Sequence, residues 1–278
     1  MQHKWYNATE IEVGSNSKQI FYMETIEVSR LSALAFFAAG EAKYKGKRNF
    51  WQNREKTFTL VGLGHAYTIE NNDGTKRFDQ VEQEWKQLTS QIVQEDQHLQ
   101  PILFGGFTFD PKNEVTGEWA KFPQSFFNVA THQLVIRNDK AFVTINLITS
   151  EATSAQAFEA LRKERDELIH ATQVKEVKTY AKPVMTSYAE PFKAEYLQSI
   201  DQVTRLIKAN EAQKVVIARS LALQFEEAVY SPQILSHVAN EQPESFLFGL
   251  EYDDMLFYGA SPERLVKVDN GRAFSSCV

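Results

Sequence analysis

Two short stretches of this sequence carry residues that could perform acid–base chemistry. The first runs from Gln213 to Arg219 and places Lys214 directly before four small or branched apolar residues. That pattern predicts a buried strand with a cation at its mouth. The second reads Gly259-Ala260-Ser261-Pro262-Glu263 and follows another apolar run. Our hypothesis is that Lys214 and Glu263 are the base and the acid of one active site.

Each of these two residues also has a purely structural interpretation. A lysine at a strand edge discourages aggregation, whereas an apolar, partly buried site favours a neutral amine that can accept a proton. Ser-Pro-Glu suits the first turn of a helix, where Glu263 would cap backbone amides. A buried carboxyl would instead stay protonated and could donate to a leaving group. The local sequence leaves both pairs of alternatives open.

The sequence argues against several other kinds of site. One cysteine and six scattered histidines are a poor basis for a zinc or iron–sulfur centre, so the histidines are interpreted as structural. The sequence has no Gly-x-Ser-x-Gly, Walker A or HExxH pattern. Gly105-Gly106 lacks the following helix of a dinucleotide fingerprint and therefore predicts a bulge or a close approach of backbones.

Composition narrows the class of protein. With 278 residues the chain can bury a large core, and its net charge of −6 opposes a nucleic-acid surface. The single cysteine, Cys277, precludes a disulfide framework and fits a reducing cytosol. The N-terminus lacks the apolar core of a signal peptide, and the longest apolar run, Leu31–Gly40, is too short to cross a bilayer. We therefore expect a cytoplasmic protein that binds neither nucleic acid nor a membrane.

The first half of the chain reads mainly as hairpins. Alternating and β-branched residues predict strands, and apolar spacings of three and four predict helices. The predicted strands cover residues 19–23, 57–69, 102–109, 122–129, 132–137 and 140–147. The predicted helices cover residues 31–39, 78–93 and 154–171, with Ser29 and Ser154 as caps of the first and last. The charged run at 162–167 is interpreted as a solvated face.

The second half mixes helices and strands after a polar linker predicted at 172–190. A helix is expected at 192–209, ended by a left-handed Asn210, and another from Ser231. Strands are expected at 214–225, 245–250, 255–258 and 265–268, and from residue 272. These elements predict an α+β fold of layered, mostly antiparallel sheets with outer helices. We divide it into a β-rich region, 1–180, and the first part of a catalytic core, 181–278.

The two chemical stretches together resemble a known family. Lys214-Val215-Val216-Ile217-Ala218-Arg219, combined with Gly259 to Val266, is similar to the chorismate-utilising enzymes, most closely to isochorismate synthases of the menaquinone pathway. Gly62-Leu63-Gly64-His65-Ala66 and Phe104-Gly105-Gly106-Phe107 resemble the N-terminal region of that family. The resemblance therefore covers most of the chain.

The resemblance implies a reaction and a cofactor. Isochorismate synthases move the hydroxyl of chorismate from C4 to C2. The residue matching Lys214 activates the attacking water, and the residue matching Glu263 protonates the departing hydroxyl. Mg²⁺ holds the substrate carboxylate, with ligands expected beyond Val278. This chain is thus expected to contain no metal ligand and no cofactor-binding residue, to be truncated, and to show little turnover by itself.

Three alternatives remain open at this point. One is a salicylate synthase, which goes on to eliminate pyruvate from isochorismate. Another is an isochorismate synthase that serves a siderophore pathway. The third is a non-catalytic fragment that binds a partner or dimerises through unpaired strand and apolar surface. The sequence sets no oligomeric state.

Overall fold

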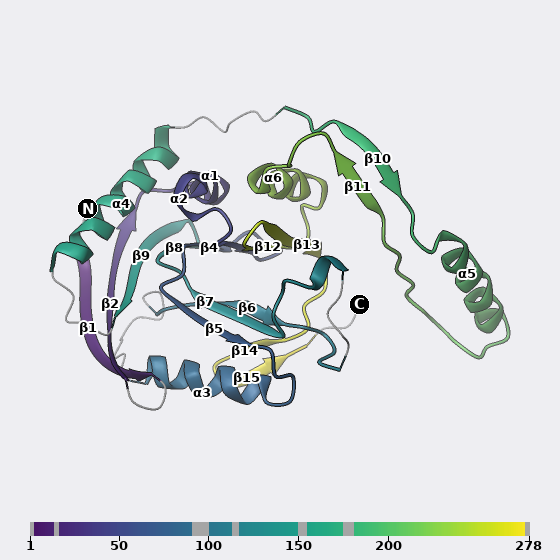
Figure 1. The fold of residues 1–278 in the computed structure, drawn as a ribbon, viewed down its shortest axis with the longest axis horizontal. Coiled ribbons are helices and arrows are strands. Elements are labelled where there is room, and N and C mark those ends of the chain that lie inside the picture. The colour runs from purple at the N-terminus through teal and green to yellow at the C-terminus, as the bar shows by residue number, and fades with distance from the viewer. Residues whose placement is uncertain are drawn as a thin grey trace. The chain divides into compact units, whose positions relative to one another are not determined.

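A computed structural model of the protein describes residues 3–13, 17–90, 100–112, 117–149, 155–174 and 181–275 (Figure 1). Ser154 and Cys277 lie outside these ranges. The chain forms two compact units, of which the first combines Met1–Lys178 with Ile234–Val278. The second unit is Thr179–Gln233.

The first unit is built on one antiparallel sheet of eight strands in the order β1-β2-β9-β8-β4-β3-β12-β13. Its neighbours along the chain pair as the hairpins β1–β2, β3–β4, β8–β9 and β12–β13. The strands of β8–β9 and β12–β13 were predicted, whereas no strand was predicted at residues 3–13. The strands are β1 His3–Val13, β2 Ser17–Val28, β3 Arg48–Gln52, β4 Phe58–Leu63, β8 His132–Arg137, β9 Lys140–Thr149, β12 Phe246–Tyr252 and β13 Met255–Ser261.

Helices cover one face of this sheet (Figure 1). They are α1 Ala33–Ala39, α2 Glu41–Tyr44, α4 Ala155–Val174 and α6 Ser231–Glu241. The main core lies between them and the sheet, where Phe36, Phe37 and Leu235 pack on Val61 and Leu63. These side chains are fully buried, and burial of each stabilises the fold by about 1.5–3 kcal/mol.

A three-stranded antiparallel sheet lies on the opposite side, in the order β5-β7-β6 (Figure 1). Its strands are β5 Tyr67–Asn71, β6 Leu103–Phe107 and β7 Ser125–Val129, with η2 Gly117–Trp119 before β7. Gly105 has a φ of +150°, and a Cβ there would lie 2.0 Å from the Phe126 carbonyl oxygen. The predicted close approach of backbones at Gly105 is therefore confirmed.

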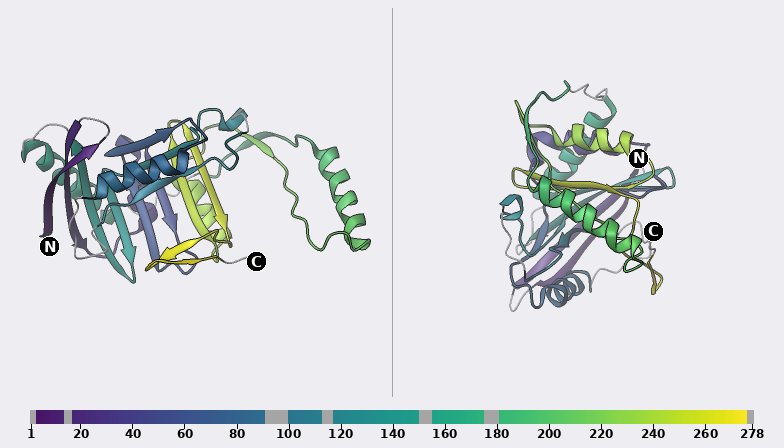
Figure 2. Two further views of the ribbon diagram at one scale, coloured as in Figure 1. Left: turned by 90° about the horizontal axis from the view of Figure 1, so that it is seen from below. Right: turned by 90° about the vertical axis from the view of Figure 1, so that its right-hand side faces the viewer.

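Two further elements complete the first unit. Helix α3, Arg77–Thr89, lies beside the three-stranded sheet (Figure 2), and its Leu88 packs with Phe21, Met23 and Val129. Strands β14 Lys267–Asp269 and β15 Arg272–Phe274 form a hairpin. Its turn has φ of 49° at Asn270 and 73° at Gly271, which suits the Asn-Gly sequence.

The second unit contains a two-stranded ribbon and one helix. Strand β10, Met185–Ala189, pairs with β11, Ala222–Phe225, and α5 spans Lys193–Lys208. The left-handed residue predicted after this helix is confirmed, because Asn210 has a φ of 58°. The predicted linker at 172–190 is wrong where α4 continues to Val174 and where β10 forms; residues 175–180 lie outside the described ranges.

The fold class predicted from the sequence, α+β, is confirmed. The cap predicted for the first helix is wrong, because Ser32 and not Ser29 accepts the Ala35 amide, at 3.3 Å. Strands β12 and β13 join the sheet of the first half of the chain through β3. The division at residue 180 remains a prediction. Among the described helices, none has the length and hydropathy required to cross a bilayer.

Candidate functional site

The stretch from Gly259 to Glu263 leaves the large sheet at the end of β13. Phe248 lies opposite Gly259 and Phe246 opposite Ser261 in the β12–β13 register. A Cβ on Gly259 would lie 2.5 Å from the Phe248 ring, so only glycine lets that ring lie across the strand. Glu263 follows the strand by two residues and its side chain is exposed.

The stretch around Lys214 differs from its prediction. Residues 214–221 form no strand, and the ladder with β10 begins only at Ala222. Val216 is 83% exposed, so the predicted buried strand at 213–219 is wrong. The physical reason is that a strand needs a neighbour to satisfy its backbone groups, and β10 is only five residues long.

Arg219, which closes this stretch, contacts the helix of its own unit. Its guanidinium carbon lies 5.3 Å from the centre of the Tyr196 ring on α5. The same guanidinium pairs with Glu190, which also binds Lys193. These contacts hold the end of the Lys214 stretch against α5.

Lys214 belongs to the second unit and Glu263 to the first. Both side chains are exposed. The burial that the sequence suggested as the cause of a neutral amine and a protonated carboxyl is therefore absent at both residues. Their roles as base and acid remain predictions, which rest on the family resemblance.

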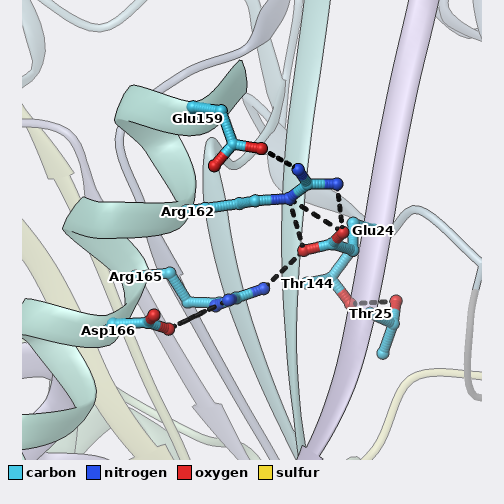
Figure 3. Close-up of polar contacts among 7 residues, drawn as sticks. All are labelled: Glu24, Thr25, Thr144, Glu159, Arg162, Arg165 and Asp166. Atoms are coloured by element: carbon cyan, nitrogen blue, oxygen red, sulfur yellow. Dashed lines mark hydrogen bonds and ion pairs between the residues drawn. The ribbon is translucent and has the colours of Figure 1, made fainter. Parts of the chain in front are cut away.

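A buried ion cluster that the sequence did not reveal joins α4 to β2 (Figure 3). The Glu24 carboxylate accepts hydrogen bonds from Arg162 Nη2 at 2.7 Å and from Arg165 Nη1 at 2.6 Å. Burial raises the pKa of Glu24, but the bonds from the two arginines outweigh it, and the net pKa is lowered. Arg162 also pairs with Glu159, and Arg165 with Asp166.

A second buried pair joins two strands of the large sheet. Arg48 on β3 is fully buried and donates to both oxygens of Glu251 on β12, at 2.7 and 2.6 Å. It also donates to the Phe37 carbonyl at 3.0 Å. A bidentate arginine–carboxylate pair is directional, so it fixes β12 beside β3. The two buried clusters thus join the strands of the sheet to one another and to its helices.

The charged run at 162–167 was predicted to be a solvated face, and this is wrong for three of its members. The Glu164 side chain is 14% exposed and pairs with Lys43. Arg165 is 2% exposed and Arg162 is half-buried, because both point toward Glu24 on the sheet. Their spacing of three places them on one side of α4. That spacing, together with a lone glutamate inside the apolar strand 20–26, was the available signal.

Two histidines of the first unit, His65 and His132, have pKa values below the ordinary value of histidine. Burial, followed by the charge of Lys47, lowers the pKa of His65 to about 4, and its Nε2 is buried without a hydrogen-bond partner among the described residues. Burial also lowers the pKa of His132, although Glu164 at 3.6 Å opposes this. Both are consistent with the structural role that the sequence predicted for histidine.

Stability should therefore fall when the pH falls below the ordinary histidine pKa. The unfolded chain binds a proton at His65 below about pH 6.5, whereas the folded chain binds it only near pH 4. Between pH 7 and 5, wild type should lose about 1–2 kcal/mol more than His65→Phe, which keeps a ring but cannot titrate. Urea unfolding at both pH values measures the difference.

His237→Gln, an exposed histidine on α6, is the control and should keep the pH dependence of wild type. An equal loss in wild type and His65→Phe would contradict the assignment of this effect to His65.

A Mg²⁺ site needs oxygen ligands, among them carboxylates. Within the described residues, no group of three or more His, Cys, Asp or Glu side chains could hold a metal ion. These residues do not fit the cation that the family resemblance implies. The steps assigned to Lys214 and Glu263 are proton transfers.

Comparison with known proteins defines the class of this protein. The family model described as "Chorismate binding enzyme" matches residues 7–278. The chain belongs to this family, and the resemblance carried by the Lys214 and Glu263 stretches is confirmed at this level.

Particular relatives are isochorismate synthases. The chain is 33% identical to the isochorismate synthase MenF of Bacillus subtilis (strain 168) over 285 residues, which cover 99% of this chain and 59% of that protein. It is 23% identical to the salicylate biosynthesis isochorismate synthase of Pseudomonas aeruginosa over 266 residues, which cover 93% of this chain and 53% of that protein.

A solved structure shares the fold. The menaquinone-specific isochorismate synthase MenF from Escherichia coli superposes with a TM-score of 0.61 at 20% identity, over 93% of this chain and 53% of that one. At that identity the likeness concerns the fold. The chain spans between about half and three fifths of the length of these relatives.

Proposed function

We propose that this protein acts as an isochorismate synthase that converts chorismate into isochorismate. The observation that carries the proposal is the 33% identity to an isochorismate synthase across 99% of the chain. The family match over residues 7–278 supports the substrate class. A menaquinone pathway, a cytoplasmic location and Mg²⁺ as cofactor belong to the same proposal.

In the proposed reaction Lys214 is the general base and Glu263 the general acid. The neutral amine of Lys214 takes a proton from water, whose oxygen forms a bond to C2 of chorismate. The ring double bonds shift, the C4–O bond breaks, and Glu263 protonates the departing oxygen, so that one water enters and one leaves. Each acid or base role typically contributes a factor of about 10²–10⁴ in rate.

The exposure of both side chains suits groups that must meet a substrate from solvent. A bound substrate that excludes water would strengthen the electrostatic interactions of both groups with it.

The test is direct. The 278-residue protein is incubated with chorismate and Mg²⁺, and products are separated by liquid chromatography with mass detection. We expect isochorismate, which has the mass of chorismate and a different retention, at a slow rate above a protein-free control. Salicylate and pyruvate would favour a salicylate synthase. Unchanged chorismate together with no chorismate binding by calorimetry would refute the proposal.

A further inference from the structure

The backbone of Glu263 is held by a single neighbouring hydroxyl. Ser261 Oγ accepts a hydrogen bond from the Glu263 amide at 3.2 Å and donates one to the Glu263 carbonyl oxygen at 3.2 Å. A serine hydroxyl can donate and accept at the same time, so one group fixes both polar ends of this residue. Pro262 lies between Ser261 and Glu263, and its ring fixes its own φ.

The residue that carries this hydroxyl lies at the end of the large sheet. Ser261 is the last residue of β13 and lies opposite Phe246 of β12. The Phe246 ring lies 6.0 Å from the Trp51 ring of β3. Ser261 therefore starts from the rigid sheet, while the Glu263 side chain extends from it into solvent.

The residue after Glu263 is anchored to the same ring. The Arg264 guanidinium carbon lies 6.0 Å from the centre of Phe246, within the range of a cation–π contact. The turn formed by residues 261–264 is thus held on both sides of Glu263, by Ser261 before it and by Arg264 after it.

We propose that Ser261 is a positioning residue that sets the direction of the Glu263 carboxyl toward the leaving oxygen. This rests on the proposed function of Glu263 as acid. A general acid has to come within about 2.6–3.2 Å of the atom it protonates. A misplacement of about 1 Å can cost about 10² in rate, so a hydroxyl that fixes the backbone of an exposed acid has a measurable effect.

The decisive variants are Ser261→Thr and Ser261→Val, which have the same shape and differ in the hydroxyl. Ser261→Thr should keep kcat within about threefold of wild type. Ser261→Val should lower kcat by about 10–100-fold with KM within about twofold, since binding does not need the proton donor. Ser90→Ala, an exposed serine after α3, is the control and should leave both constants unchanged.

Hydrogen exchange of the Glu263 amide, followed by nuclear magnetic resonance, gives a second measurement that does not depend on activity. We expect exchange to be faster in Ser261→Val than in Ser261→Thr, because only the threonine can accept the amide. Equal kcat values for these two variants would overturn the positioning role and leave the proposed function standing. A wild-type protein that neither binds nor converts chorismate would overturn both, whatever the exchange rates.

Discussion

Lys214→Ala is expected to lower kcat/KM for chorismate by about 10²–10⁴. The proposed step needs an amine that removes a proton from the attacking water, and alanine cannot accept one. Arg219, five residues after Lys214, contacts Tyr196 of α5 and holds this stretch against the helix. The Lys214 side chain is exposed, so its truncation removes no core side chain. Isochorismate formation, measured by chromatography over a range of chorismate concentrations, gives the value.

Glu263→Gln should cause a loss of similar size, because glutamine keeps the shape of glutamate but cannot donate a proton to the departing hydroxyl. The double variant should be little worse than either single variant, because two groups that serve one step are not additive. This non-additivity would be the kinetic sign that the two residues act in one reaction.

Matched controls remove the same charges elsewhere. Lys208→Ala on α5 and Glu244→Gln, whose side chain is 87% exposed, should each retain activity within about threefold. If Lys214→Ala also stayed within threefold of wild type, the lysine would not be the base.

Glu24→Ala is the substitution for which we expect the largest loss of stability, about 3–5 kcal/mol. It removes the carboxylate that Arg162 and Arg165 share, and Arg165 is 2% exposed (Figure 3). Arg165 would then keep only its pair with the exposed Asp166, so most of the cost of burying its guanidinium would stay uncompensated. Since the whole domain is stable by only about 5–15 kcal/mol, the midpoint of urea unfolding should fall markedly.

Glu159→Ala is the matched control, because Glu159 pairs with the same Arg162 but its side chain is 60% exposed. Exposed ion pairs contribute about 0–1 kcal/mol, so this variant should unfold almost as wild type does. A loss of less than about 1 kcal/mol for Glu24→Ala would show that the cluster is hydrated in solution and does not hold α4 on the sheet.

Local patterns predicted much of this fold. Apolar spacing of three and four placed α3, α4 and α5 within a few residues of their observed ends, since one stripe of each was marked along the sequence. Alternation with an intervening Asn-Asp turn placed β8 and β9, because Asn138 and Asp139 accept positive φ, at 47° and 67°. In these cases the information lies within a dozen residues.

The sequence interpretation was wrong where the structure of a segment depends on residues far away in the chain. Residues 214–221 have strand composition, but the described ribbon offers them no neighbouring strand. The local sequence predicts that Arg165 belongs to a solvated charged run, yet Arg165 donates a hydrogen bond to Glu24, which lies far away in the chain. Neither partner can be identified from the local pattern.

The amino-acid sequence by itself determined the family to which the chain belongs, and it pointed to Lys214 and Glu263 as the candidates for its chemistry. It did so because motif and composition are properties of the order of residues. Only the tertiary structure decided that both side chains are exposed, that Ser261 holds the Glu263 backbone, and that two arginines converge on Glu24. Exposure and hydrogen bonding depend on which surfaces meet, and those surfaces come from segments that only folding brings together.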